Sequence, residues 1–180
     1  MNRVPLIDRA DTSAERKALL DEIHGAFGAT PNMFRAVANS PAALRSMWGS
    51  FGALGAGTLG ARLGEQIAVA VADRNRCAYC LAAHTVLGQN AGASADEMAA
   101  AQRGESGDLK TQAALRFALK VVSERAKVGD ADVQALRDAG FSDEAVVEIL
   151  AHVALNLFTN YVNVAFAVPV DFPAVKLSNA

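Results

Sequence analysis

Two cysteines and a histidine lie close together in the segment CAYCLAAH, residues 77–84. If this segment begins a helix, Cys77, Cys80 and His84 follow one another at intervals of three and four residues and share one face. Unpaired backbone N–H groups in a first helical turn lower the pKa of a thiol placed there, and the thiolate is the form that attacks peroxides and disulfides. His84 lies one turn beyond Cys80 and can accept its proton. The segment therefore predicts a dithiol with its own base.

Glu65 is the fourth candidate catalytic residue. It lies on the preceding predicted helix, about residues 61–73, which the short turn at residues 74–76 would fold back against the cysteine helix. In that arrangement its carboxylate can orient or protonate His84. The two arginines of the turn would add positive charge near the thiols.

Two other interpretations of the cysteines stay open. Two thiolates, an imidazole and a carboxylate can fill a tetrahedral metal site, although structural zinc sites usually join two separate ligand pairs. An isolated cysteine is often a small buried hydrophobe. Because the pair has C-x-x-C spacing at the start of a helix, we favour redox chemistry and expect neither a metal nor a cofactor.

The composition predicts an all-α protein. The 180 residues fit one domain, alanine is abundant, and aromatic residues make up only 6%. A net charge of -2, with both signs mixed along the chain, gives no basic surface for nucleic acid or an anionic membrane, so neither is an expected partner. The first residues lack the apolar stretch of a secretory signal, which predicts a cytoplasmic location. In a reducing compartment a close cysteine pair is more often catalytic or metal-binding than structural.

Capping residues and prolines mark where the expected helices begin. Thr12 with Glu15, and Ser94 with Glu97, form capping-box patterns. The other expected caps are Thr30, Ser40, Asp108, Asp130 and Ser142, and the helices are expected to end near Gly25–Gly28, Trp48, Asp73, Asn90, Lys127, Ala139 and Val168. We expect a single domain over 1–180, with an N-terminal helical extension (1–29), a core (30–173) and a tail (174–180).

The last predicted helix, residues 143–168, is long and apolar enough to span a bilayer. Its polar residues argue against a span, because they recur every three or four positions and form one stripe. The stripe consists of Glu148, His152, Asn156, Asn160 and Asn163. It either faces solvent or an interface, or it lines a polar cavity in which His152 participates without being catalytic. The apolar remainder of the helix predicts a homo-oligomer whose interface the asparagines supply with hydrogen bonds.

The order Glu65, eleven residues, Cys77-Ala78-Tyr79-Cys80, three residues and His84 resembles the motif of the AhpD-like alkylhydroperoxidases, a branch of the carboxymuconolactone decarboxylase family. The segment FTNYVNVAFAVPVDFP is similar to the peroxidase-related subgroup, and the resemblance covers about residues 30–173. It implies an AhpD-like helical bundle, assembly into trimers or hexamers, and reduction of organic hydroperoxides with a dithiol or a lipoylated protein as reductant. Cys80 would correspond to the attacking thiolate, Cys77 to its disulfide partner, and His84 with Glu65 to the proton relay.

Tyr79 departs from this motif, because the best-studied members carry a second histidine there. On a helix its side chain is expected to point away from the face shared by the cysteines and His84, so the dithiol and the relay can survive the change. Two alternative functions stay open. One is a decarboxylase-type lyase that uses His84 or His152, and the other is a redox-sensing or scaffold protein that forms the disulfide without turnover.

Overall fold

The computed structural model describes residues 2–178, which form nine helices and no strand. The helices are α1 (Ala14–Phe27), α2 (Asn32–Val37), α3 (Pro41–Gly55), α4 (Ala61–Arg74), α5 (Ala78–Asn90), α6 (Ala95–Gln102), α7 (Leu109–Ser123), α8 (Asp130–Asp138) and α9 (Asp143–Ala165). The predicted all-α class is confirmed.

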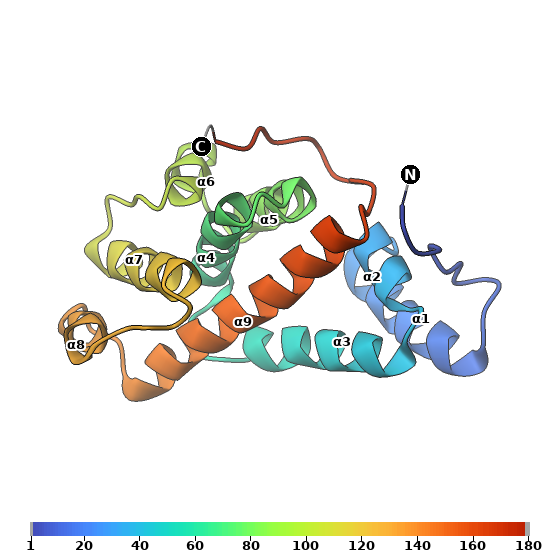
Figure 1. Ribbon diagram of the computed structural model, residues 1–180, viewed down its shortest axis with the longest axis horizontal. Coiled ribbons are helices and arrows are strands. Elements are labelled where there is room, and N and C mark those ends of the chain that lie inside the picture. Colours follow the sequence, from blue (N-terminus) through green and yellow to red (C-terminus); the bar gives the residue numbers. More distant parts are fainter. Residues whose placement is uncertain (1, 179–180) are drawn as a thin grey trace.

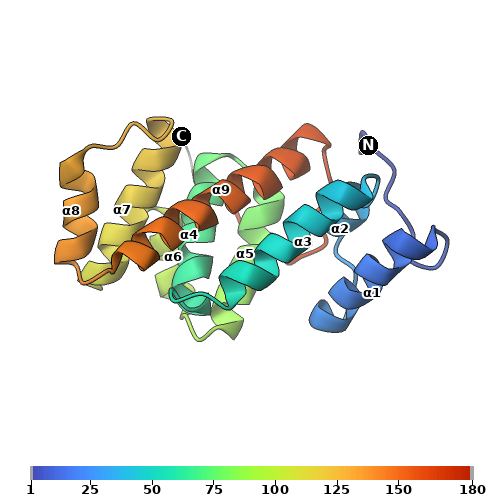
Figure 2. The same cartoon turned by 90° about the horizontal axis from the view of Figure 1, so that it is seen from below.

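Helices α4 and α5 form a hairpin at the centre of the molecule. Helix α4 packs against α5, α6, α7 and α9, and it is buried along nearly its whole length. Figure 1 shows α9 running diagonally past this hairpin, with α7 and α8 at one end of the molecule and α1 and α2 at the other, and with α3 running from that end towards the middle. Seen from below, α3 and α9 cross in front of α4 and α5 (Figure 2).

Small residues let the central helices approach closely. An added Cβ at Gly88 of α5 would lie 2.4 Å from the Met98 methyl group and 3.3 Å from Glu65 Cβ. A larger residue at this position would therefore force the Met98 side chain to move and press on Glu65.

The caps at Ser40, Asp108 and Ser142 are confirmed, and so is the capping box of Ser94 with Glu97. Three others were wrong by one position. Helix α1 is preceded by Ser13 rather than Thr12, α2 by Pro31 rather than Thr30, and α8 by Gly129 rather than Asp130.

Some helix ends also differ from the prediction. Helix α3 continues past Trp48 to Gly55, because packing against α9 outweighs the low helix propensity of its glycines. Helix α7 ends at Ser123, and α9 at Ala165. Left-handed backbone follows each of these ends, at Arg125 (φ 53°) and at Ala167 (φ 50°), and prevents the helix from continuing.

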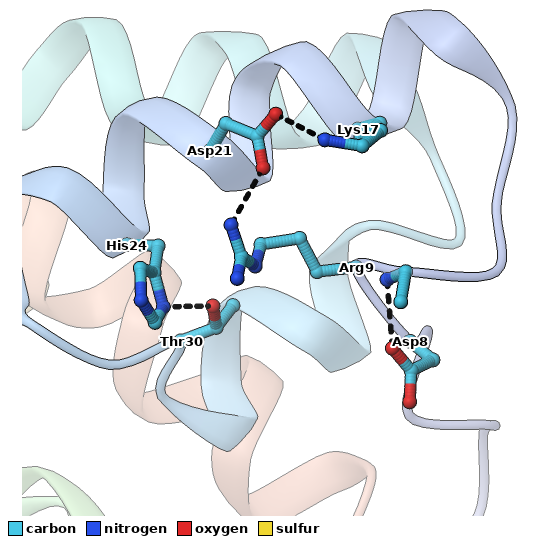
Figure 3. A network of polar contacts seen from close by, with 7 residues as sticks. Asp8, Arg9, Lys17, Asp21, His24 and Thr30 are labelled. Atoms are coloured by element: carbon cyan, nitrogen blue, oxygen red, sulfur yellow. Dashed lines mark hydrogen bonds and ion pairs between the residues drawn. The ribbon is translucent and has the colours of Figure 1, made fainter.

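The segment before α1 is fastened to that helix by polar contacts (Figure 3). Arg9 Nη1 lies 2.8 Å from Asp21 Oδ1, and Lys17 Nζ lies 2.6 Å from Asp21 Oδ2. Near the end of α1, His24 Nδ1 lies 3.2 Å from the hydroxyl of Thr30, which follows the helix. The Arg9–Asp21 pair thus joins the preceding segment to α1, whereas the Lys17–Asp21 pair lies within the helix; α1 packs against α2 and α3. The division of the chain into an extension, a core and a tail stays a prediction.

Residues 169–178 cross the molecule from the end of α9 to α6 as an extended segment (Figure 1). Asp171 Oδ2 accepts a hydrogen bond from the Asn32 backbone N–H at 2.7 Å. At the other end, the Asp73 carboxylate accepts hydrogen bonds from the Ser178 N–H at 2.9 Å and from Gln102 Nε2 at 2.8 Å. The segment is therefore held at both ends.

By length and composition alone, α9 is the one helix of residues 2–178 that is long and apolar enough to cross a bilayer. Of its most apolar stretch, 44% is buried inside the structure. Core helices of folded proteins can be equally long and apolar, so this property does not distinguish a core helix from a membrane-spanning one.

Candidate active site

Cys77 is the N-cap of α5, so it precedes the helix rather than lying within it. Its Sγ accepts a hydrogen bond from the Cys80 backbone N–H at 3.2 Å. Hydrogen bonding from the Cys80 thiol lowers the pKa of Cys77, and the backbone N–H groups of Cys80 and Tyr79 and the charge of His84 lower it further, against the opposing effect of burial. This agrees with the low thiol pKa predicted from the helix start.

Cys80 behaves differently from Cys77. It lies in the first turn of α5, but burial raises its pKa well above the ordinary thiol value, and the neighbouring Cys77 raises it further. The prediction of a low pKa was therefore wrong for Cys80, because depth in the core outweighs the helix start. Both cysteines are reduced, so the pair is a dithiol in which Cys77 loses its proton first.

His84 and Glu65 are joined across the α4–α5 hairpin as predicted. His84 Nδ1 lies 2.7 Å from Glu65 Oε2, and both side chains are largely buried. Burial alone would lower the pKa of His84, but the charge and hydrogen bond of Glu65, together with the charge of Cys77, raise it above the ordinary value. With Nδ1 held by Glu65, Nε2 is the nitrogen that can exchange protons with a ligand.

Other expected contacts are not formed. Within residues 2–178, no hydrogen bond joins His84 to either sulfur. The two arginines of the turn also point elsewhere, since Arg74 bonds to the Ser123 hydroxyl and Arg76 to the Ser178 carbonyl. The relay therefore consists of the hydrogen-bonded pair Glu65 and His84, and it acts on the dithiol through the charge of His84, without a hydrogen bond.

Cys80 and His84 face a small apolar pocket of about 40 Å³. Roughly 30 Å³ is the space of one water molecule in the liquid, so the pocket has room for little more than one water molecule. The other lining residues are Phe27, Pro31, Met33, Phe34, Phe51, Tyr79, Ala83, Leu87 and Phe172. Cys77 does not line it. The four phenylalanines come from α1, α2, α3 and the C-terminal segment, and no local spacing connects them, so the sequence alone does not predict that they meet.

The polar stripe of α9 faces the interior. Asn156, Asn160 and Asn163 are 5%, 0% and 4% exposed, so the prediction that they supply hydrogen bonds to a subunit interface was wrong. Asn163 Nδ2 donates to Cys80 Sγ at 3.1 Å, a contact that the sequence analysis did not predict. Asn75 Nδ2 donates to Asn160 Oδ1 at 3.0 Å.

The other end of the stripe lies near the relay. The Glu148 carboxylate accepts hydrogen bonds from the Thr58 backbone N–H at 2.7 Å and hydroxyl at 2.8 Å. The His152 ring packs on Gly64, where an added Cβ would lie 3.1 Å from it. Burial lowers the pKa of His152 despite the nearby carboxylates of Glu148 and Glu65, so its ring is neutral near pH 7.

The residues considered for a metal site do not form a ligand set. Across residues 2–178, no three histidine, cysteine, aspartate or glutamate side chains are grouped so that they could hold a metal ion.

Comparison with known proteins agrees with this arrangement. Residues 41–124, which contain Glu65, both cysteines and His84, match the carboxymuconolactone decarboxylase family. A peroxidase-related protein from a Silicibacter species shares 26% identity over 93% of this chain and 91% of its own, with a TM-score of 0.82. A second, from Ralstonia eutropha and described as an alkylhydroperoxidase AhpD core, shares 28% identity over 94% of this chain and 92% of its own, also with a TM-score of 0.82. The family match therefore places residues 41–124 in the carboxymuconolactone decarboxylase family, and the whole chain shares its fold with these AhpD-like, peroxidase-related proteins.

The AhpD-like fold also occurs in a protein with another activity. The debrominase Bmp8 shares 22% identity over 93% of this chain and 91% of its own, with a TM-score of 0.80. A variant of it has been solved with 2,3,4-tribromopyrrole bound. No curated protein matched the chain.

Tyr79, the departure from the AhpD-like motif, is part of the pocket wall. Its hydroxyl accepts a hydrogen bond from the Met33 backbone N–H at 3.2 Å, and its ring meets Phe172 edge to face at 5.7 Å. Burial raises the pKa of this phenol, so it is neutral. Tyr79 therefore lines the same pocket as Cys80 and His84, a role that its predicted position off the dithiol face did not indicate.

Proposed function

We propose that the protein is a thiol-dependent peroxidase that reduces organic hydroperoxides through Cys77 and Cys80, with Glu65 and His84 as its proton relay. The proposal rests above all on one observation. Cys80 and His84 line the same apolar pocket, with Glu65 2.7 Å behind His84. A nucleophile and a proton donor therefore meet a ligand from the same side, as peroxide cleavage requires.

The reaction follows from these positions. The Cys80 thiolate attacks the distal oxygen of ROOH, the O–O bond breaks, and Cys80 becomes a sulfenic acid while RO⁻ takes a proton from His84 Nε2. The Cys77 sulfur then attacks Cys80 Sγ, which forms the disulfide and releases the hydroxyl oxygen as water. ROOH and two thiols thus become ROH, water and one disulfide. A dithiol, such as a lipoylated protein, then reduces the disulfide by exchange.

The pocket favours an apolar hydroperoxide. Its walls are aromatic and aliphatic, and about 40 Å³ is too small for any organic peroxide without some opening. The lining residue Phe172 lies on an extended segment rather than on a helix, so movement of this segment can widen the pocket without unfolding a helix. The fold shared with the debrominase suggests a second substrate class, since a dithiol can also replace bromine on a ring by hydrogen. The small volume of the pocket favours the peroxide, because only its terminal oxygen has to reach Cys80.

The test is consumption of cumene hydroperoxide with dithiothreitol as reductant. We expect turnover by the unsubstituted protein and none by Cys80→Ser. Cys77→Ser is the matched variant, and it should stop after one oxidation to sulfenic acid. The opposite pattern would exchange the roles of the two sulfurs. Absence of turnover with a reversible disulfide would favour the redox sensor, and absence of both would favour the lyase.

A further inference from the structure

Buried amide groups of α9 lie beside Cys80, and they do not line the pocket. Asn163 Nδ2 donates to Cys80 Sγ at 3.1 Å, and both residues are almost completely buried. Asn160, one turn earlier on α9, is fully buried, and its Oδ1 is engaged by Asn75. This leaves Asn160 Nδ2 without a partner among the described residues.

We propose that the side-chain amides of Asn163 and Asn160 form a thiolate site, in which Asn163, supported by Asn160, stabilises the negative charge of the reacting sulfur, Cys80 Sγ. The inference deepens the proposed function, since it rests on Cys80 being the attacking sulfur. Cys80 is the sulfur that faces the pocket, but its burial disfavours the thiolate form. A group that stabilises this thiolate is therefore needed for the proposed reaction.

The donor geometry favours an anion over a thiol. A hydrogen bond from an amide N–H to a charged acceptor is roughly twice as strong as one to a neutral acceptor. Burial has the largest effect and raises the pKa of Cys80, whereas the hydrogen bond from Asn163 lowers it and the nearby amide of Asn160 lowers it further. The two amides therefore offset part of the cost of a buried charge.

The thiolate site also favours transfer of a proton from Cys80 to Cys77, which places the negative charge on Cys80. The dithiol loses its first proton from Cys77, so the pair keeps one proton, on Cys80. Transfer of that proton from Cys80 Sγ to Cys77 Sγ makes Cys80 the thiolate without adding or removing a proton from the pair. The Asn163 amide strengthens its hydrogen bond in the product of this transfer, so it favours the reactive form.

The buried amides of α9 include polar atoms that lack hydrogen-bond partners among the described residues. Asn156 Oδ1 and Asn163 Oδ1 are buried without a hydrogen-bond partner among residues 2–178, as is Asn160 Nδ2. Buried polar atoms without partners destabilise a fold, and leucine would fill similar space without this cost. A residue that destabilises the fold and contacts the nucleophile is typical of a functional site.

The test measures the pKa of Cys80 in the Cys77→Ser background, where it is the only cysteine of the chain. Iodoacetamide alkylation is followed against pH, and the shape of the profile gives the pKa independently of how readily the pocket opens. The titratable groups facing Cys80 in this background, His84 and Tyr79, are the same in every variant. Asn163→Leu should raise the pKa by about one to two units and slow alkylation near pH 7 by roughly 10- to 100-fold. Asn160→Leu should have a smaller effect.

Asn156→Leu is the matched control. Asn156 lies on the same helix, is similarly buried and has an unpartnered oxygen, but its Nδ2 donates to the His152 carbonyl rather than to sulfur. This substitution should leave the pKa of Cys80 unchanged. Asn163→Ala repeats the test without added bulk, in case the leucine variant does not fold.

The inference is overturned if neither Asn163 variant changes the profile, or if Asn156→Leu changes it as much. Peroxide turnover by the unsubstituted protein is measured separately, so the two proposals can fail independently. A pKa shift without turnover would refute the peroxidase and keep the thiolate site, whereas turnover without a shift would do the reverse.

Discussion

Replacing Glu65 with glutamine separates the charge of the relay from its shape. Glutamine can still accept a hydrogen bond from His84 Nδ1, but it cannot balance the positive charge of the protonated ring. Burial lowers the pKa of His84, and the contributions of Glu65 reverse that effect. In Glu65→Gln we therefore expect the pKa of His84 to fall below the ordinary value of about 6.5.

The size of the change follows from the geometry. The two groups lie 2.7 Å apart, and their side chains are 10% and 21% exposed, so solvent screens the pair only slightly. A hydrogen bond to a charged group contributes about 1.5 to 3 kcal/mol. One pKa unit corresponds to roughly 1.4 kcal/mol, so the pKa of His84 should fall by about one to two units.

The same shift makes a stability prediction of definite sign. Because the folded-state pKa of His84 is raised, its stabilising contribution is complete below the unfolded-state pKa of about 6.5 and is lost as pH rises through the folded-state value. The free energy of unfolding should therefore differ more between the unsubstituted protein and Glu65→Gln near pH 6 than near pH 9. Thermal unfolding at both pH values measures this difference.

Histidine NMR titration measures the pKa directly, since the chain has three histidines and His84 can be assigned by substitution. Glu148→Gln is the control, because Glu148 is held by Thr58 and lies near His152 rather than bonded to His84. It should leave the pKa of His84 unchanged. An unchanged His84 pKa in Glu65→Gln would refute the electrostatic account of the relay.

Three further outcomes are expected. Mild peroxide should convert Cys77 and Cys80 to a disulfide within one peptide, seen by mass spectrometry as the loss of two hydrogens; finding only bridges between chains would contradict this. Tyr161, 60% exposed on an apolar part of α9, is expected at a homo-oligomer interface, so Tyr161→Asp should reduce the mass measured by light scattering, and a monomeric unsubstituted protein would exclude the interface. Burial raises the pKa of Asp73, but hydrogen bonds from Ser178 and Gln102 outweigh it and lower the pKa. Its stabilising contribution should therefore be present above about pH 4 and lost on acidification, and Asp73→Asn should make the C-terminal segment more sensitive to proteolysis.

The features predicted correctly from the sequence are those set by neighbouring residues. The caps at Ser40, Ser94, Asp108 and Ser142 depend on side chains within one helical turn. The approach of Glu65 to His84 depends on one tight turn between two helices. In both cases the spacing along the chain determines the contact.

The features that were missed join distant segments. Asn163 and Cys80 are separated by 83 positions, and the four phenylalanines of the pocket come from four separate segments. The order of the two thiol pKa values was also missed, because it depends on how deeply each sulfur is buried. Local periodicity carries no information about such depth until the helices are packed.

The pocket has two halves with separate origins in the chain. Its reactive residues, Cys80 and His84, lie within residues 41–124, the part that matches the family. Three of its phenylalanines, Phe27, Phe34 and Phe172, lie outside that part. Substitutions in these flanking segments can therefore reshape the ligand pocket while the dithiol and its base keep their positions. For protein engineering, this makes α1, α2 and the C-terminal segment the natural place for a randomised library, because new ligands can be sought there without rebuilding the catalytic hairpin.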